Sequence, residues 1–259
     1  MTSASSWIRR SPPRRAPRAR LVCFAHAGGG ASSFSGWTRA LPDDVELVRA
    51  QLPGREDRVV RPACTTVSQM LPELSREIKG LEALPFALYG HSMGAIVAFE
   101  VTRELRRQGA LLPAVLFVSG RRAPHLPLSH APLDALDEPA LLAYLREMGG
   151  VDERLLGRFT WSTAYLPTLR ADLQVSDAYA YRPEPPLSVP IYVFRGYQDS
   201  RVSVHEAMGW SRHTCAGFVF RALSGRHFFD RDGHAALLRV ISDRIGDLRE
   251  MAVPLALGE

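Results

Sequence analysis

The sequence predicts an α/β protein, with one mostly parallel sheet flanked by helices. Two observations predict this class. Short apolar runs rich in β-branched and aromatic residues alternate along the chain with longer runs whose apolar residues recur at helical spacing. The chain has 259 residues, 46% of them hydrophobic, which is enough to bury the core of one domain that carries an insertion. We therefore expect one domain rather than two.

Six short segments are expected to be buried strands, because each is rich in strand-forming residues and bounded by glycine, proline or polar residues. In chain order they are residues 21–24, 45–49, 86–89, 115–119, 191–194 and 218–222. The helices expected around them are residues 32–41, 67–81, 94–108, 204–213 and 228–250. Helix 94–108 carries the clearest signals, since Arg106 and Arg107 suit its C-terminal end and Gly109 can terminate it.

Residues 121–186 interrupt this alternation, because they contain no convincing strand. Helices are expected instead at residues 133–148, 154–165 and 169–181. A helical insertion between two strands of a parallel sheet predicts a lid that covers the strand ends. An ordinary long crossover connection is the alternative.

The first 20 residues account for the net positive charge of the chain. The formal net charge is +5, and without the six arginines of this segment, which contains no acid, it falls to about −1. Because the rest of the chain is nearly neutral, we expect no nucleic-acid binding. Residues 1–20 are predicted to be a disordered basic tail, and residues 21–259 the folded domain. A docking arm for an acidic partner is the alternative role of the tail.

Cysteine usage and hydropathy predict a cytoplasmic protein that needs no metal or cofactor. Cys23, Cys64 and Cys215 are an odd number and lack the spacing of a zinc site. No apolar run approaches the roughly 20 residues that span a bilayer. No apolar stretch follows the basic N-terminus, as it would in a secretory signal. We expect neither membrane association nor secretion.

One serine lies where a parallel sheet can present a nucleophile. Residues 90–94 read Gly-His-Ser-Met-Gly, directly between the predicted strand 86–89 and the predicted helix 94–108. The two glycines permit a strained turn that raises the Ser92 hydroxyl above the edge of the sheet. The pattern predicts a catalytic serine. The alternative is a glycine-bounded turn whose serine has no role.

A serine nucleophile needs a histidine base that a carboxylate holds in one tautomer. Of the eight histidines, His227 alone follows a late predicted strand through a short loop and precedes the final helix. Asp199 follows strand 191–194 and reaches the same edge of the sheet, whereas Asp172 and Asp177 fall on a predicted lid helix. The chain order Ser92, Asp199, His227 is typical of α/β-hydrolases.

Two backbone amides are candidates for an oxyanion hole, which must stabilise charge on the attacked carbonyl oxygen. Met93 follows the nucleophile, and Ala27 lies in the glycine-rich loop 26–30 after the first strand. The competing reading of this loop is a phosphate cradle. It lacks both glycine patterns typical of such loops.

Five short motifs occur in order along the chain: FAHAGG at 24–29, LPGREDR at 52–58, GHSMG at 90–94, LPTLRAD at 166–172 and GRHFF at 225–229. Together they resemble the stand-alone type II thioesterases of polyketide synthase and nonribosomal peptide synthetase systems. The resemblance runs from about Leu21 to the last helix. It implies an α/β-hydrolase fold with Ser92, His227 and Asp199 as catalytic triad. It also implies an oxyanion hole of the Ala27 and Met93 amides, under a mobile lid.

The resemblance further implies a substrate and a partner. The substrate is an acyl thioester on the phosphopantetheine arm of an acyl carrier or peptidyl carrier protein, and hydrolysis clears misprimed groups. We expect a monomer. Because carrier proteins are acidic, Arg121 and Arg122 are candidate docking residues, with a solvated turn as the alternative.

Two motif positions depart from the common pattern. This chain has Ala25 where proline is common and Arg226 where glycine is common. Neither removes a catalytic group, although Arg226 adds bulk and charge beside the base. Residues 52–58 have no role that the sequence explains directly. We expect a loop-fixing salt bridge through Arg55 or Glu56 rather than a part in catalysis.

Three other functions compete with this one. A general carboxylesterase or lipase would use the same triad on oxygen esters. A chain-terminating thioesterase would cyclise a finished product, which the lack of a preceding carrier domain in this short chain disfavours. A catalytically silent hydrolase-fold protein would only bind acyl ligands or partners, which an intact triad disfavours.

Overall fold

The computed structural model describes residues 6–11, 13, 15–81, 83–128, 132–133, 135–148, 163 and 165–251. Its centre is a seven-stranded sheet with the order β1-β3-β2-β4-β5-β6-β7. The strands are β1 (Ile8–Ser11), β2 (Ala19–Phe24), β3 (Val45–Ala50), β4 (Phe86–His91), β5 (Val115–Ser119), β6 (Ile191–Gly196) and β7 (Phe218–Leu223). All neighbouring strands pair in parallel except β1 and β3, which pair antiparallel.

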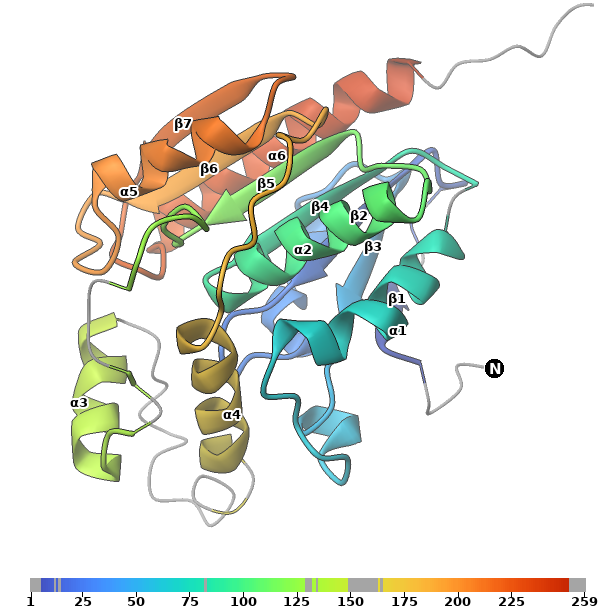
Figure 1. Cartoon of the computed structure of the whole chain (residues 1–259). Helices are drawn as coiled ribbons and strands as arrows, with labels where there is room; N and C mark the ends of the chain where they lie inside the picture. The colour runs from blue at the N-terminus through green and yellow to red at the C-terminus, as the bar shows by residue number, and fades with distance from the viewer. Residues whose placement is uncertain are drawn as a thin grey trace, which may run out of the picture.

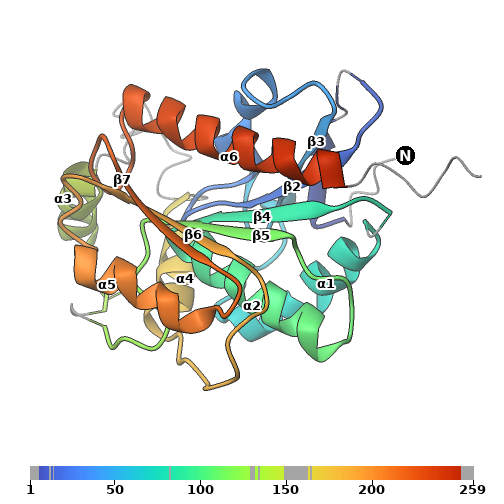
Figure 2. The ribbon, with the colours of Figure 1, turned by 90° about the horizontal axis from the view of Figure 1, so that it is seen from above.

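Helices cover both faces of this sheet (Figure 2). They are α1 (Val67–Lys79), α2 (Met93–Arg107), α3 (Glu138–Met148), α4 (Leu166–Asp177), α5 (Val204–Met208) and α6 (Arg231–Met251). Helices α1, α2 and α5 lie on one face and α6 on the other. The core between the sheet and α2 contains Phe99 and Trp210, whereas the core under α6 contains Trp37 and Ile241. The predicted parallel α/β architecture is therefore confirmed.

The predicted strands all form, but some helices differ from their predicted form. Residues 32–41 form two short 3-10 helices, η1 (Ala31–Phe34) and η2 (Trp37–Arg39), rather than one α-helix. Residues 204–213 divide into α5 and the 3-10 helix η6 (Gly209–His213). The last helix begins at Arg231 rather than residue 228, since the Asp230 side chain accepts the Gly233 N–H at 2.9 Å and caps the first turn.

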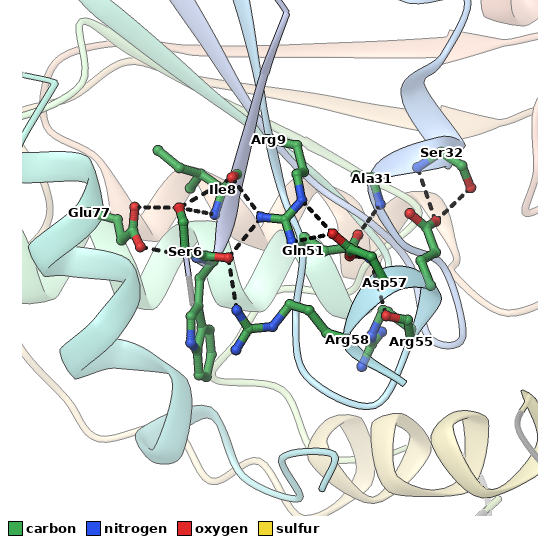
Figure 3. Close-up of polar contacts among 12 residues, drawn as sticks. Ser6, Ile8, Arg9, Ala31, Ser32, Gln51, Arg55, Asp57, Arg58 and Glu77 are labelled. Carbon is green, nitrogen blue, oxygen red and sulfur yellow. Dashed lines mark hydrogen bonds and ion pairs between the residues drawn. The ribbon is translucent and has the colours of Figure 1, made fainter. Parts of the chain in front are cut away.

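The N-terminal segment is not a disordered tail where the structure describes it. Strand β1 pairs with β3 at the edge of the sheet. The Trp7 backbone N–H donates to Glu77 at 3.0 Å, and the Arg9 guanidinium donates to Asp57 at 2.6 Å (Figure 3). The sequence prediction for these residues was wrong because the acids that neutralise the arginines are supplied from distant parts of the chain.

Two helices of the insertion lie beyond one end of the sheet (Figure 1). Helix α3 corresponds to the predicted helix 133–148, and α4 begins three residues before the predicted helix 169–181. The predicted helix 154–165 lies almost entirely outside the described residues. Leu141 and Leu145 of α3 pack against Leu169 and Leu173 of α4 in a small core of their own. The two helices therefore share a small core of their own, while α4 also joins the main core through Val175.

Among the residues that the structure describes, no helix is both long enough and apolar enough to cross a membrane.

Candidate active site

Ser92 lies in a strained turn between β4 and α2. Its backbone has φ 54° and ψ −113°, a conformation that costs free energy in a residue other than glycine. The Ser92 N–H donates to the Ser119 carbonyl at 2.8 Å and so joins the turn to β5. A Cβ at Gly90 would lie 2.1 Å from the Gly94 carbonyl oxygen, and one at Gly94 would lie 2.2 Å from that of Phe24. Both glycines of the motif are therefore required by close packing.

Asp199 and His227 meet at the ends of β6 and β7. His227 Nδ1 lies 3.2 Å from Asp199 Oδ2, and both side chains are buried. The other carboxylate oxygen, Oδ1, accepts the backbone N–H groups of Arg201 at 2.8 Å and Val202 at 3.2 Å. A Cβ at Gly196 would lie 1.9 Å from the Arg226 carbonyl oxygen, so this glycine lets the loop that carries His227 approach β6. The two residues that the sequence paired are adjacent in the structure.

The Asp199 carboxyl is held in its ionised form. Burial acts to raise its pKa, but the hydrogen bond with His227 and the backbone N–H donors lower it by more, so the pKa lies below the usual range. An ionised Asp199 accepts the Nδ1 proton of His227, which leaves Nε2 as the basic nitrogen. This is the tautomer that a general base for Ser92 requires.

Ser92 and His227 line the same cavity, which has a volume of about 50 Å³. Ala27 lines it beside them, while Tyr144 of α3 and Leu173 of α4 contribute to its wall. The side chain of Asp199 is 0% exposed. The insertion helices thus cover the serine and histidine, and the aspartate supports the histidine from outside the cavity.

The glycine-rich loop after β2 and the first residue of α2 each leave one backbone amide available. In the loop, the Gly28 N–H donates to Asp172 Oδ2 at 2.7 Å, and the Gly29 N–H donates to the His26 carbonyl at 2.9 Å. Within the described residues, the backbone N–H groups of Ala27 and Met93 donate to no acceptor. The two amides that the sequence proposed as oxyanion donors are therefore not used by the fold itself.

A buried ion pair joins this loop to the lid helix α4. Arg55 donates from Nη1 to Asp172 Oδ2 at 2.6 Å and from Nη2 to Asp172 Oδ1 at 2.8 Å, and the Asp172 side chain is 0% exposed. Arg55 Nη1 also donates to the Gly29 carbonyl at 2.9 Å. The predicted loop-fixing salt bridge through Arg55 forms, and Asp172 is its partner.

Glu56 fixes the other end of the same loop. Its Oε1 accepts the Ser32 backbone N–H at 3.1 Å and the Ser32 hydroxyl at 2.6 Å (Figure 3). The Gln51 side chain also accepts the Ala31 N–H, at 2.7 Å. Residues 51–56 thus hold the loop that carries Ala27.

Two further histidines, the buried His91 and the partly buried His26, lie close to His227, and the sequence analysis did not predict this cluster. The ring centroids of His91 and His227 lie 5.2 Å apart, and those of His26 and His91 lie 6.0 Å apart. Burial and the nearby His227 lower the pKa of His26 to about 4 and that of His91 well below its usual value. Both are neutral near pH 7, so neither opposes protonation of His227. His91 Nδ1 also lies 2.7 Å from the Ser119 hydroxyl.

The lowered pKa values of His26 and of a second histidine, His213, predict a loss of stability in mild acid. The pKa values of His26 and His213 are about 4 in the folded protein, against a usual value of 6.5, mainly through burial. Between pH 4 and pH 6.5 the unfolded chain binds more protons than the folded protein. The two histidines therefore make their full contribution to the free energy of unfolding only above pH 6.5. The free energy of unfolding should fall by up to about 1.4 kcal/mol per pH unit for each histidine as the pH drops towards 4.

Urea unfolding at pH 7 and pH 5 measures this loss. A His213→Gln variant removes one of the titrating groups, whose ring neighbours are Phe99 and His125 rather than the histidines at Ser92, and it should show a smaller difference between the two pH values. Equal unfolding free energies of the unchanged protein at pH 7 and pH 5 would contradict the prediction.

Arg121 and Arg122 do not form the surface that the sequence suggested for docking. Arg122 is 8% exposed, and its Nε donates to the Leu126 carbonyl at 3.2 Å. Arg121 Nη2 donates to the Ser176 carbonyl on α4 at 2.9 Å. Both residues line the cavity beside Ser92. Their burial under the lid removes them as candidates for a carrier-protein contact.

The parallel sheet, the serine turn after β4 and the residues after β6 and β7 define an α/β-hydrolase. More narrowly, a profile of the thioesterase domain family matches residues 19–245. The chain belongs to this family of thioester hydrolases, and its motifs' resemblance to type II thioesterases is confirmed.

Relatives from several biosynthetic systems match most of the chain. Thioesterase PikA5 of Streptomyces venezuelae is 37% identical over 240 residues, which cover 92% of this chain and 85% of PikA5. The gramicidin S biosynthesis protein GrsT of Aneurinibacillus migulanus is 34% identical over 229 residues, which cover 88% of this chain and 90% of GrsT.

Solved structures agree with this assignment. RedJ, a thioesterase from the prodiginine biosynthetic pathway in Streptomyces coelicolor, superposes with a TM-score of 0.83 at 37% identity and covers 90% of this chain and 88% of its own. YbtT, a type II thioesterase from the yersiniabactin NRPS/PKS biosynthetic pathway, has a TM-score of 0.82 at 28% identity. That match covers 96% of this chain and all of YbtT.

Proposed function

We propose that this protein is a stand-alone editing thioesterase. It hydrolyses acyl groups from the phosphopantetheine arm of acyl carrier or peptidyl carrier proteins in polyketide or nonribosomal peptide synthesis. One observation carries the proposal: Ser92 shares a cavity with His227, and the His227 ring contacts the ionised Asp199 on its other side. The protein acts in the cytoplasm as a monomer and uses no metal or cofactor.

The first half-reaction forms an acyl-enzyme. Ser92 Oγ attacks the thioester carbonyl carbon while its proton passes to His227 Nε2. The carbonyl oxygen becomes an oxyanion that accepts the N–H groups of Ala27 and Met93. When this intermediate collapses, the carbon–sulfur bond breaks and His227 returns the proton to the departing thiolate. The acyl group remains on Ser92, and the carrier protein leaves with a free thiol.

The second half-reaction uses water. His227 Nε2 accepts a proton from the attacking water, and the same two amides hold the second oxyanion. Collapse breaks the ester bond, and the proton from His227 regenerates the Ser92 hydroxyl. The products are the free acid and the enzyme in its starting state. Asp199 stays ionised throughout and stabilises the imidazolium of His227.

The position of α4 supports this mechanism. Asp172 of α4 accepts the N–H of Gly28, the residue after the proposed oxyanion donor Ala27. The lid helix therefore supports the loop that carries the oxyanion amide. Helix α4 thus contributes to the wall of the cavity and also supports the loop that carries Ala27.

The proposal is tested by comparing one acyl group on two leaving groups. Butyryl-carrier protein and a butyryl oxygen ester are offered to the protein, and the release of acid is measured. We expect a clear preference for the carrier-bound thioester. A preference for the oxygen ester would support a general carboxylesterase instead.

A fluorophosphonate probe distinguishes an enzyme from a silent acyl-binding protein. Covalent labelling of the folded protein at Ser92, located by peptide mass analysis, is the expected result. Folded protein that is not labelled, and that hydrolyses neither substrate, would overturn the proposal.

A further inference from the structure

The cavity beside Ser92 is rich in arginine. Arg121, Arg122 and Arg201 line it, together with one carboxylate, Asp177. The Asp177 carboxylate accepts the Leu133 backbone N–H at 2.6 Å. Two of the three arginines are also engaged by the fold, since Arg121 donates to a carbonyl of α4 and Arg122 donates to the Leu126 carbonyl. Among the residues that the structure describes, Arg201 is the arginine of this cavity whose donors lack acceptors.

Arg201 lines this cavity and carries enclosed donors. Its Nε and Nη2 atoms are buried and have no hydrogen-bond acceptor among the described residues. The guanidinium lies over the Tyr144 ring of α3, with Cζ 4.9 Å from the ring centroid, so the side chain is held in place. The nearest acid in sequence, Asp199, is committed to His227 and to backbone N–H groups.

Enclosed guanidinium donors without an acceptor cost free energy, and a carboxylate satisfies them best because it accepts two parallel N–H groups. At about 50 Å³, the cavity accommodates a group of a few heavy atoms rather than a long chain. A short acyl chain that ends in a carboxylate meets both conditions. Its carbonyl carbon can lie at Ser92 while its anionic end reaches Arg201.

We propose that the cavity beside Ser92 binds an anionic group of the acyl chain, and that Arg201 selects short dicarboxylic acyl thioesters over neutral ones. This rests on the proposed thioesterase function and adds the chemical class of its substrate. Arg121 lines the same cavity and contributes a second positive charge. Arg201 is a residue that determines specificity, and the triad performs the same steps on either class of acyl group.

The phosphate of the phosphopantetheine arm is the other anion that a substrate brings. The pantetheine chain separates this phosphate from the thioester sulfur, whereas Arg201 lines the same small cavity as the nucleophile. An anion that is close to the reacting carbonyl therefore fits the site better than one at the far end of the arm. Substrates with and without the phosphate distinguish the two sources.

The test compares succinyl and succinamoyl thioesters, which match in size and differ in charge. N-Acetylcysteamine is the first thiol because it carries no phosphate. We expect the wild-type protein to prefer the succinyl thioester. The Arg201→Gln variant should lose about 10- to 100-fold in kcat/KM for the succinyl thioester and change by less than about threefold for the succinamoyl one.

Two further variants control for nonspecific effects. Arg212→Gln removes an exposed arginine that does not line the cavity, and it should behave as the wild type with both substrates. Arg201→Lys keeps the charge without the planar fork, and it should retain part of the preference. An equal loss on both thioesters in Arg201→Gln would indicate a structural role and overturn the proposal.

Coenzyme A thioesters of the same two acyl groups test the phosphate. If Arg201→Gln lowers kcat/KM only for the coenzyme A substrates, whatever their acyl group, then the arm supplies the anion and the proposal is overturned. A loss confined to the succinyl group on both thiols supports it.

Binding of succinate gives a readout that does not depend on hydrolysis. Millimolar succinate should raise the Tm of the wild-type and Arg212→Gln proteins and leave that of Arg201→Gln unchanged, with succinamide as the neutral control. Succinate binding without hydrolysis of any thioester would overturn the proposed function and leave the anion site standing. Hydrolysis without preference for the charged acyl group would support the proposed function and overturn the proposed role of Arg201.

Discussion

Replacing Ser92 by alanine is expected to lower kcat for thioester hydrolysis by a factor on the order of 10⁶, which leaves only the residual acceleration that the oxyanion hole and substrate binding provide. Replacing Asp199 by asparagine should cost about 10⁴-fold. The carboxylate of Asp199 accepts the Nδ1 proton of His227, whereas an amide can donate to Nδ1 and favour the wrong tautomer. His227 would then present a protonated Nε2 to Ser92, and the general base would be lost.

Single-turnover hydrolysis of an acyl-carrier protein measures both variants. Asp243→Asn is the matched control, because Asp243 is an exposed carboxylate on α6 and its replacement should leave kcat unchanged. Circular dichroism and the Tm establish that each variant is folded. An Asp199→Asn variant that keeps more than a tenth of the wild-type kcat would contradict the assigned triad.

Removing the Asp172 carboxylate is expected to destabilise the protein by about 3–5 kcal/mol. Asp172→Ala leaves the buried Arg55 guanidinium without its anionic partner, and an uncompensated buried charge is costly. It also removes the acceptor of the Gly28 N–H, beside the proposed oxyanion donor Ala27. We therefore expect a fall in kcat as well, of up to the 10²- to 10³-fold that loss of one oxyanion donor typically costs.

Two companion variants separate charge from hydrogen bonding. Asp172→Asn keeps an acceptor for the Gly28 N–H, so it should retain more kcat than Asp172→Ala even where its stability is low. The double replacement Arg55→Met with Asp172→Leu removes both charges and should recover part of the lost stability. Urea unfolding measures the free energies, and the same hydrolysis assay measures kcat.

An exposed ion pair provides the comparison. On α6, Arg244 Nη1 lies 3.0 Å from Asp247 Oδ2, and the Asp247 side chain is 61% exposed. Arg244→Ala should therefore change the free energy of unfolding by less than about 1 kcal/mol. A loss for Asp172→Ala that is as small as this would show that the buried pair does not hold α4 to the glycine-rich loop.

Local sequence patterns predicted the strands and turns that carry the proposed triad, because each of these patterns extends over only a few residues. The central strands are continuous apolar runs because both faces of a parallel sheet are buried. The turn at Ser92 needs glycine on both sides, which leaves a recognisable pentapeptide. Asp199 and His227 could be chosen because the carboxyl ends of parallel strands meet at one edge of the sheet.

Contacts between distant segments were not predictable in the same way. The many arginines near the N-terminus, with no acid among them, suggested disorder. In the structure, however, β1 pairs with β3 and Arg9 contacts Asp57. Arg121 and Arg122 looked like surface residues, yet the lid helices cover them. In each case the deciding partner lies on another element, and neither composition nor periodicity identifies it.

By itself, the sequence determined the α/β class, the position of the strained serine turn and the choice of His227 and Asp199 as the other members of the proposed triad. These follow from apolar periodicity, glycine positions and the chain order of strand ends. Only the tertiary structure decided that Arg55 pairs with Asp172, a residue 117 positions away, and that Arg201 stacks on Tyr144 inside the cavity. Such contacts depend on how the lid helices dock against the strand ends, which no local pattern encodes.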